Sequence, residues 1–312
     1  MVPKVGWDAL AVWRDERMGE EGDLWHRAII DPTLLRLVGP VRGRRLLDLA
    51  CGNGYLTRRW ARQGAARALG IDASPRSLAL ARRRERAHPS GAEFLRRDAG
   101  HLVGLEDGSF DLVVANMALM DLRDAEGAVR EVARVLAPRG RFVFSVSHPC
   151  FDLDDRSAWV VERGRGSDGV FRDVYWRKVQ KYRQERRVRV PWRISASETG
   201  FTTSYHRTLT TYSRILREAG LWIVRIEEPS PLPEAVRDSP QGRFMVEVPL
   251  HLVVEAQAHR TGPIGRRSSR VRARPPESQR TAGSLAGAAR RSGSGGRSPR
   301  TGSPRPGSSS GS

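Results

Sequence analysis

The chain has 312 residues, enough for one large domain or a domain with an insertion, and its apolar fraction of 39% is adequate for a core. No apolar run approaches the roughly 20 residues that span a bilayer, and the N-terminus lacks the pattern of a secretory signal. The two cysteines, Cys51 and Cys150, are too few for a disulfide framework. Composition therefore disfavours membrane and disulfide-rich classes and predicts a soluble cytoplasmic protein.

The net charge of +19 comes from arginine and is concentrated at one end of the chain. There are 51 arginines and three lysines, and residues 261–312 alone contain eleven arginines and one acid. A general basic field is weak support for a particular partner, so we expect neither a nucleic-acid nor a membrane partner. Residues 261–312 are mostly Arg, Ser, Gly and Pro, which cannot bury a core, and are predicted to be a disordered basic tail.

Residues 1–40 are predicted to be a helical approach segment, in which DLWHRAIIDPTLLRLVG supplies the apolar positions. From Arg44 to His148 short apolar runs alternate with helical patterns. This alternation predicts βαβ units and a mainly parallel sheet. The predicted strands are RLLDLA, ARALGID, AEFLRRD, FDLVVAN and RFVFSVSH, and the predicted helices cover residues 55–63, 75–87 and 125–136.

Two of these helices have clear start signals. Ser74 can cap the helix that has Pro75 at its first position, and Asp124 can cap the next one. Pro138 and Gly140 are expected to end that helix and start the following strand.

Residues 150–205 interrupt this rhythm, because they mix aromatic residues with many charges and show no clean period. We interpret them as an insertion or cap, whose aromatic residues either line an acceptor pocket or form a small core of their own. Regular structure is expected again over residues 206–260, with a helix near residues 208–219 and the strands LWIVRIEE and VEVPLHLVVEA. The aromatic residues of the insertion are Trp159, Tyr175, Trp176, Tyr182 and Trp192.

The motif that carries most chemical information is LLDLACGNGYL, in which an apolar strand runs into Gly52 and Gly54 and a helix follows directly. Glycines allow backbone angles closed to other residues and leave room for a ligand. Open α/β sheets bind ligands at the carboxyl ends of their strands. A dinucleotide fingerprint would have a third glycine where this chain has Thr57, and a glycine pair alone also fits a simple strand-to-helix turn.

Two acids strengthen the ligand hypothesis. Asp72 ends the second predicted strand, where adenosine cofactors need a carboxylate to accept hydrogen bonds from ribose hydroxyls. Asp98 ends the third strand, where a carboxylate can accept from the adenine amino group. Each acid alone also fits a turn or a helix cap. Their positions at the ends of successive strands favour a cofactor site.

These residues, in this order, resemble the class I S-adenosylmethionine (SAM)-dependent methyltransferases. The resemblance runs from about Gly22 to Glu255 and is most specific from Leu46 to Cys150. It implies a Rossmann-like, seven-stranded, mostly parallel sheet flanked by helices, with the last strand antiparallel and SAM as cofactor. Residues 41–149 would be the SAM-binding core and residues 206–260 would complete its sheet. The sequences HPCF, YHRTLTTY and EEP resemble a subgroup that acts on small molecules.

The resemblance also implies which residues contact the cofactor. The glycine loop would hold its methionine part, and the acid after the second strand its ribose. Residues after the third strand would lie by adenine, and those after the fourth near the sulfonium. In that order the residues are Asp48, Ala50, Gly52 and Gly54; Asp72; Asp98 and Ala99; and Asn116 and Met117.

A methyl acceptor that carries a proton usually needs a base, and imidazole titrates near the working pH. The candidates are His148, at the end of the fifth predicted strand, and His206. Both also fit structural roles, as a strand-end and a helix-start residue. His26 either helps to cover the cofactor or lies at the surface. The adjacent acids at 154 and 155 are poor support for a metal site, so we expect none.

Three other functions remain open. A nucleic-acid or protein methyltransferase could use the basic tail, although FDLVVANMALM lacks an Asn-Pro-Pro-Tyr-type loop and the tail lacks aromatics that stack on bases. A non-catalytic Rossmann-like module is disfavoured by the intact glycine pair and the two acids. A nicotinamide-dependent oxidoreductase is disfavoured by Thr57. The sequence therefore predicts a methyltransferase that acts on an O or N atom of a small molecule.

Overall fold

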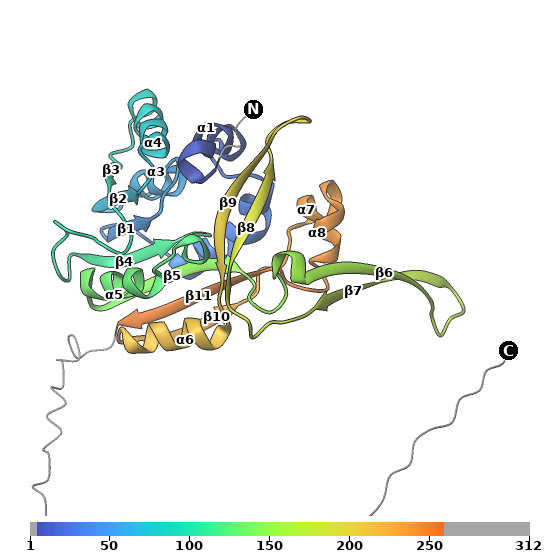
Figure 1. Ribbon diagram of the computed structural model, residues 1–312. Coiled ribbons are helices and arrows are strands. Elements are labelled where there is room, and N and C mark those ends of the chain that lie inside the picture. Colours follow the sequence, from blue (N-terminus) through green and yellow to red (C-terminus); the bar gives the residue numbers. More distant parts are fainter. Residues whose placement is uncertain (1–4, 259–312) are drawn as a thin grey trace, which may run out of the picture. The chain divides into compact units, whose positions relative to one another are not determined.

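The computed structural model describes residues 5–258 (Figure 1). The prediction of a disordered basic tail over residues 261–312 lies outside the described residues. Within the part of the chain that is described, no helix combines the length and apolar character needed to cross a membrane.

Seven strands form the main sheet, in the spatial order β10-β11-β5-β4-β1-β2-β3. The neighbours from β5 to β3 pair in parallel, whereas β11 is antiparallel to both β5 and β10. The predicted fold class, a mostly parallel Rossmann-like sheet with its last strand antiparallel, is confirmed. The strands are β1 (Arg45–Leu49), β2 (Arg67–Asp72), β3 (Glu93–Arg96), β4 (Phe110–Ala115), β5 (Leu136–Ser147), β10 (Leu221–Glu227) and β11 (His251–Ala258).

Helices cover both faces of this sheet, because successive side chains of a strand point to opposite faces. Leu47 and Leu49 of β1 pack in one apolar layer with α5 and α6, while Leu46 packs in the other with α2 and α3. Strands buried on both sides read as continuous apolar runs, which is why they are visible in the sequence. The helices are α2 (Asp31–Val38), α3 (Tyr55–Arg62), α4 (Pro75–Ala87), α5 (Ala125–Val135) and α6 (Leu209–Glu218).

The predicted helix caps are present. The Ser74 hydroxyl accepts a hydrogen bond from the amide of Ser77, and Asp124 accepts from the amide of Gly127. The segment before the sheet contains α1 (Trp7–Met18) and a π-helical turn, η1 (His26–Ile30), that runs directly into α2. Helix α1 packs beside α4, close to the carboxyl ends of the parallel strands (Figure 1).

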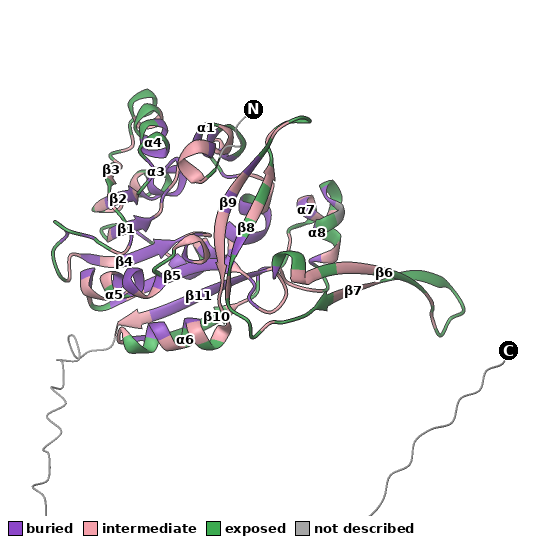
Figure 2. Ribbon diagram, viewed as in Figure 1, coloured by how far each residue is buried: buried purple, intermediate pink, exposed green. Residues whose placement is uncertain are grey.

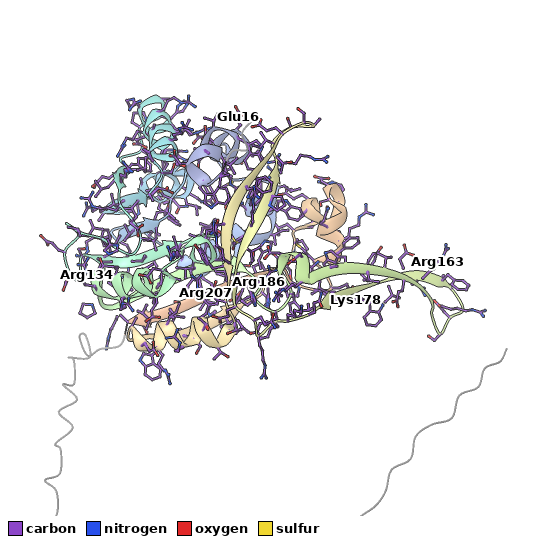
Figure 3. The ribbon with its side chains drawn as sticks, viewed as in Figure 1. Glu16, Arg134, Arg163, Lys178, Arg186 and Arg207 are labelled. Atoms are coloured by element: carbon purple, nitrogen blue, oxygen red, sulfur yellow. The ribbon has the colours of Figure 1, made fainter. Side chains whose placement is uncertain are left out.

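The insertion folds into two β-hairpins, which the sequence pattern did not reveal. Strand β6 (Ser157–Arg165) pairs with β7 (Phe171–Val179), and β8 (Arg186–Arg193) pairs with β9 (Thr199–His206). The β6–β7 hairpin projects away from the sheet and is largely exposed on both faces (Figures 1 and 2). Its charged side chains include Arg163 and Lys178 (Figure 3). A strand without a buried face needs no alternation of polar and apolar residues, so it leaves no period to detect.

Two boundaries differ from those expected. Strand β5 already begins at Leu136, directly after α5, so Pro138 and Gly140 lie within it rather than before it. The final strand begins only at His251, and short helices α7 (Pro233–Asp238) and α8 (Pro240–Phe244) precede it. Single helical turns, η2 (Leu119–Asp121) and η3 (Asp154–Arg156), follow β4 and β5.

Candidate active site

A cavity of about 820 Å³ lies at the carboxyl ends of the parallel strands. Residues of α1, of the segment from 23 to 30 and of the β8–β9 hairpin complete its walls. The cavity thus joins the strand ends, where the sequence placed a cofactor, to the insertion, where it placed an acceptor. Of the predicted cofactor-binding residues, those that line the cavity are Asp48, Ala50, Gly52, Asp72, Asp98, Ala99, Asn116 and Met117.

The glycine loop is shaped by left-handed backbone angles. Gly52 has a φ of 57°, and no atom lies within 4 Å of the position that a Cβ would occupy there. Gly54 does not line the cavity; its φ is 73°, and a Cβ would lie 2.3 Å from the Phe94 ring. Gly52 therefore leaves space open beside the cavity, whereas Gly54 allows the turn into α3 to pack on β3. Ala50 reaches a φ of 58°, a strained value for a residue with a Cβ.

Asp72 supports the loop from the end of β2. One carboxylate oxygen accepts from the Gly52 amide at 2.9 Å, and the other accepts from the Ser74 amide at 2.8 Å. Burial raises the pKa of Asp72, against the hydrogen bonds from those amides, which lower it. Each oxygen has two lone pairs, so each can accept one further hydrogen bond.

Asp98 and Ala99 lie together after β3. The Asp98 carboxylate accepts from the Gly100 amide at 2.8 Å and its side chain is largely exposed, while Ala99 is buried. This pairing gives an apolar floor beside a solvent-facing acceptor, an arrangement that suits the face and the amino edge of a flat heteroaromatic ring.

Asp48 lies beneath the glycine loop. It is only 2% exposed and accepts a hydrogen bond from the Thr57 hydroxyl at 2.5 Å. Burial raises the pKa of Asp48 to about 7, against the Thr57 hydrogen bond. Thr57, where a dinucleotide fingerprint would have glycine, therefore ties the first turn of α3 to the end of β1.

A cluster of hydrogen-bonded side chains surrounds Asn116, which follows β4. The Asn116 amide donates to Asp31 at 2.9 Å and to the Tyr55 hydroxyl at 3.0 Å, and Tyr55 also donates to Asp31 at 2.9 Å. The other side of the amide accepts from Ser145. Burial raises the pKa of Asp31, against its partners. These bonds fix the orientation of Asn116, which sequence reasoning could not assign.

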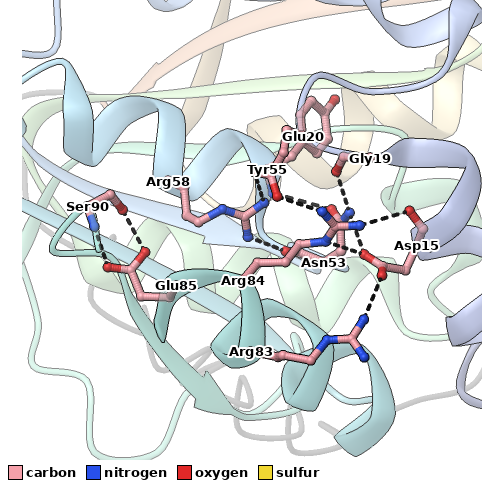
Figure 4. A network of polar contacts seen from close by, with 10 residues as sticks. All are labelled: Asp15, Gly19, Glu20, Asn53, Tyr55, Arg58, Arg83, Arg84, Glu85 and Ser90. Atoms are coloured by element: carbon pink, nitrogen blue, oxygen red, sulfur yellow. Dashed lines mark hydrogen bonds and ion pairs between the residues drawn. The ribbon is translucent and has the colours of Figure 1, made fainter. Parts of the chain in front are cut away.

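Helix α1 is held against the glycine loop by a network of charged and amide groups (Figure 4). The Asn53 amide donates to Asp15 at 3.0 Å and to the Gly19 carbonyl at 2.9 Å. Arg84 of α4 donates to Asp15 at 2.7 Å, and the fully buried Arg58 donates to the Asn53 carbonyl at 2.6 Å. The wall of the cavity that α1 provides is therefore fixed to its floor.

The two histidines expected to act as bases have other partners. His148 is buried, with Nε2 2.9 Å from Glu228 and Nδ1 accepting from the Cys150 amide at 3.1 Å. His206 has Nε2 2.7 Å from the Tyr182 carbonyl and lines an adjoining pocket of about 30 Å³ that shares Asp152 and Asp154 with the main cavity. Neither lines the main cavity. Their assignment as bases stays a prediction.

The aromatic residues of the insertion divide between the two roles expected for them. Trp192 of β8 lines the cavity and lies 5.5 Å from Trp7 of α1, centroid to centroid. Trp159 and Tyr175 pack instead on Phe244 of α8. Of the two hairpins, β8–β9 is therefore the one that contributes an aromatic residue to the cavity lining.

Of a group of polar residues in the N-terminal segment, sequence reasoning named His26 as a possible cover for the cofactor but missed Arg14 and Asp23. Arg14, Asp23 and His26 all line the cavity, and they are bonded to one another. The spacing of Asp23 and His26, three residues apart in a helical stretch, was the available signal, since it places both side chains on one face.

The cavity fits an adenosine cofactor by its own chemistry. Free space lies beside Gly52, the Asp72 oxygens retain lone pairs for ribose hydroxyls, and Ala99 with Asp98 can take a purine. The volume falls within the roughly 300–1,000 Å³ of small-molecule sites. Fold and site together define a Rossmann-like protein that binds a nucleoside cofactor.

Comparison with known proteins shows which Rossmann-like proteins this chain resembles. Residues 47–144 match the family model described as methyltransferase domain. A SAM-dependent methyltransferase structure from Mesorhizobium loti superposes with a TM-score of 0.59 and 28% identity, over 77% of this chain and 100% of that one. Over this core the chain is therefore similar to the class I SAM-dependent methyltransferases, and SAM is the cofactor that this similarity implies.

Curated relatives match part of this chain. The malonyl-[acyl-carrier protein] O-methyltransferase of Halorhodospira halophila is 36% identical over 45% of this chain and 48% of its own length. The demethylmenaquinone methyltransferase of Thermus thermophilus is 38% identical over 38% of this chain and 52% of its own length. The chain thus spans about half the length of these relatives.

Proposed function

We propose that this chain transfers the methyl group of SAM to an O or N atom of a small-molecule acceptor. One observation carries the proposal: a single cavity is lined by the strand-end residues of the cofactor site and by the α1 and β8–β9 walls. A cofactor held at the strand ends would therefore share one cavity with an acceptor held by those walls.

Each predicted cofactor-binding residue would contact the part of SAM that lies nearest to it. Asp72 would accept from the ribose hydroxyls, Asp98 would lie at the adenine edge, and Gly52 would allow the methionine part to approach the backbone. SAM supplies a methyl group on a sulfonium, which is a good leaving group. The protein must then align the acceptor, exclude water and keep the acceptor unprotonated.

The relatives support a small acceptor. Those compared above are named for malonyl-[acyl-carrier protein] and for demethylmenaquinone. The cavity walls fit the same interpretation, because Trp7, Trp192 and Met245 give apolar surface inside the cavity.

Calorimetric titration of the full chain tests the cofactor part of the proposal. SAM and its demethylated product, S-adenosylhomocysteine, should both bind, whereas the nicotinamide cofactor NAD should not. Asp72→Ala should weaken both affinities by about 10- to 100-fold, because two charge-assisted hydrogen bonds are lost. Asp72→Asn, which keeps one acceptor oxygen, should lose less.

Asp173→Ala is the matched control, since Asp173 is an exposed residue of β7 outside the cavity. It should leave both affinities unchanged. Circular dichroism should show that all variants are folded. A folded wild-type chain that binds neither compound, or that binds NAD instead, would reject the proposal.

A further inference from the structure

Asp23 and His26 form a hydrogen-bonded pair on the wall of the cavity. The His26 Nδ1 lies 2.8 Å from one Asp23 oxygen, which also accepts from the His26 backbone amide at 3.0 Å. A carboxylate only accepts, so Nδ1 carries the proton and the lone pair is left on Nε2. The other Asp23 oxygen accepts from Arg14 at 2.7 Å. The imidazole is therefore fixed in one tautomer and one orientation.

The charges within this group balance. Burial raises the pKa of Asp23, but the hydrogen bond and charge of His26, together with Arg14, lower it well below its usual range. Asp23 is therefore an anion that offsets Arg14, and His26 can gain a proton beside it. With Nδ1 protonated, Nε2 accepts a long hydrogen bond of 3.4 Å from the Arg14 guanidinium, so Arg14 must turn from Nε2 to the acceptor oxygen before Nε2 can take a proton.

The pair lies close to the residues that follow β4. His26 meets the Tyr55 ring edge-on, with centroids 6.3 Å apart, and Tyr55 is bonded to Asn116. Met117 packs in the same apolar cluster as the adjacent Trp25. By the family resemblance, Asn116 and Met117 lie near the sulfonium. His26 therefore lines the cavity close to these residues, whereas His148 and His206 do not line it.

We propose that His26, held by Asp23, is the general base that removes the proton of an aromatic hydroxyl acceptor, with Arg14 as the partner of the resulting oxygen anion. The inference rests on the proposed methyl transfer. An aromatic acceptor fits because Trp7, Trp25 and Trp192 all line the cavity.

The step balances without a further reactant. The O–H bond of the acceptor breaks, its proton moves to Nε2, and the imidazolium is stabilised by Asp23. The oxygen then forms a bond to the methyl carbon as the carbon–sulfur bond breaks, and that electron pair stays on sulfur. The proton later leaves His26 to solvent. A neutral amine with a free lone pair would not need this base.

The tautomer of His26 can be measured without any acceptor. Nitrogen-15 NMR of the seven histidine rings in the full chain, with His26 assigned by its loss in His26→Gln, should show Nδ1–H and a bare Nε2. Asp23→Asn should abolish this preference, whereas His88→Gln, at an exposed site, should not affect it. A protonated Nε2 with a bare Nδ1 in the neutral ring would overturn the proposal.

A coloured phenol tests the base directly. 4-Nitrophenol is titrated into the complex with S-adenosylhomocysteine, and phenolate formation is followed by its absorbance. The bound probe should ionise at lower pH than the free probe. His26→Gln should raise the apparent pKa of the bound phenol by at least about one unit, or tenfold in the ionisation equilibrium.

The titratable and charged groups that face His26 are Arg14, Asp23, Asp31, Tyr55 and His251.

The outcomes separate the two proposals. If S-adenosylhomocysteine does not bind, the methyltransferase proposal fails. If it binds and the phenol does not, or if His26→Gln leaves the ionisation of the bound phenol unchanged, the assignment of His26 is wrong. If His26→Gln weakens S-adenosylhomocysteine itself by the same factor as the phenol, His26 holds the cofactor and is not the base.

Discussion

At the scale of single residues, Gly52 and Gly54 stand two positions apart and serve different purposes. Both have positive φ, but a Cβ at Gly54 would meet Phe94 at 2.3 Å, whereas none of the surrounding atoms lies within 4 Å of a Cβ at Gly52. Gly54→Ala should therefore lose more stability, by a clash added to the roughly 1–2 kcal/mol of backbone strain. Gly52→Ala should lose more cofactor affinity, because its methyl group would occupy ligand space.

Urea unfolding and calorimetric titration of both variants give the two quantities. Gly54→Ala should show the larger loss of unfolding free energy, and Gly52→Ala the larger loss of cofactor affinity. Affinities are compared under conditions in which both variants are folded. Equal effects on both quantities would show that the loop acts as one rigid unit and that the two glycines are equivalent.

Asp48 makes the stability of the protein depend on pH. Its pKa is raised by burial from 3.8 to about 7, so between these values the folded state binds more protons than the unfolded state. Its contribution therefore becomes less favourable as pH rises through this window and is constant outside it. Asp48→Asn keeps an acceptor for Thr57 and carries no charge. Its stability relative to wild type should rise by a few kcal/mol between acid and neutral pH.

Urea unfolding of Asp48→Asn and wild type across this pH range measures the difference directly. Because both proteins share all other titrating groups, the difference isolates Asp48. A difference that does not vary with pH would mean that Asp48 is ionised in the folded protein throughout.

At the scale of elements, α1 depends on the glycine loop for its position. Asn53→Ala removes the two donors that reach Asp15 and Gly19, and leaves their acceptors buried without those partners (Figure 4). A loss of about 1–3 kcal/mol in unfolding free energy is expected, with weaker binding of S-adenosylhomocysteine because a cavity wall loosens.

Glu85→Ala is the comparison for this prediction. It breaks bonds to Ser90 in the same view of the structure, but these only fix the chain beyond α4. Thermal unfolding and titration should show a smaller loss of stability and unchanged affinity for Glu85→Ala. An equal loss of affinity in both variants would mean that α4, rather than α1, transmits the effect.

The two hairpins of the insertion should differ in importance. Replacing residues 163–173 by an Asn-Gly turn would shorten the β6–β7 hairpin after the pair Glu162 and Val174, which is in register with the hydrogen-bonded pair Gly166 and Val170 and therefore suits a two-residue loop. Thermal unfolding and cofactor affinity should change little, because the removed part is exposed. Trp192→Ala in β8 should instead weaken phenol binding, since it opens the aromatic wall. A large loss of affinity on shortening β6–β7 would contradict this division.

At the scale of the whole molecule, the sequence predicts those features of the fold and the site that leave a pattern in neighbouring residues of the chain. The core strands are buried on both faces, so their apolar runs were visible, and Asp72 was found because the end of a strand marks its place. The pair of Asp23 and His26 has no such mark. Its meaning depends on Asn116 and Tyr55, which only tertiary packing brings near. The hairpins were hidden because nothing is buried on their outer faces.

The charge of the cavity opposes that of the molecule, and this leads to a last prediction. The chain carries +19, yet nine aspartates and two arginines line the cavity. Burial raises the pKa of Asp121 to about 7 and that of Asp154 to about 6, so both lose protons as pH rises through this range. The sulfonium of SAM is a cation, whereas the sulfur of S-adenosylhomocysteine is neutral. The preference for SAM should therefore grow with pH, because only SAM gains from each new negative charge.

Titration of both compounds from below pH 6 to above pH 7 gives the ratio of their dissociation constants. A shift of about tenfold toward SAM is expected, equivalent to about 1.4 kcal/mol. Asp121→Asn should reduce this shift, because it removes one of the titrating charges while it retains an acceptor for the Trp7 indole, which donates to Asp121 at 2.8 Å. If the ratio is independent of pH in the wild type, the cavity carboxylates do not sense the charge of the cofactor. The role of these carboxylates in cofactor binding would then be limited to the hydrogen bonds that Asp72 makes with the ribose.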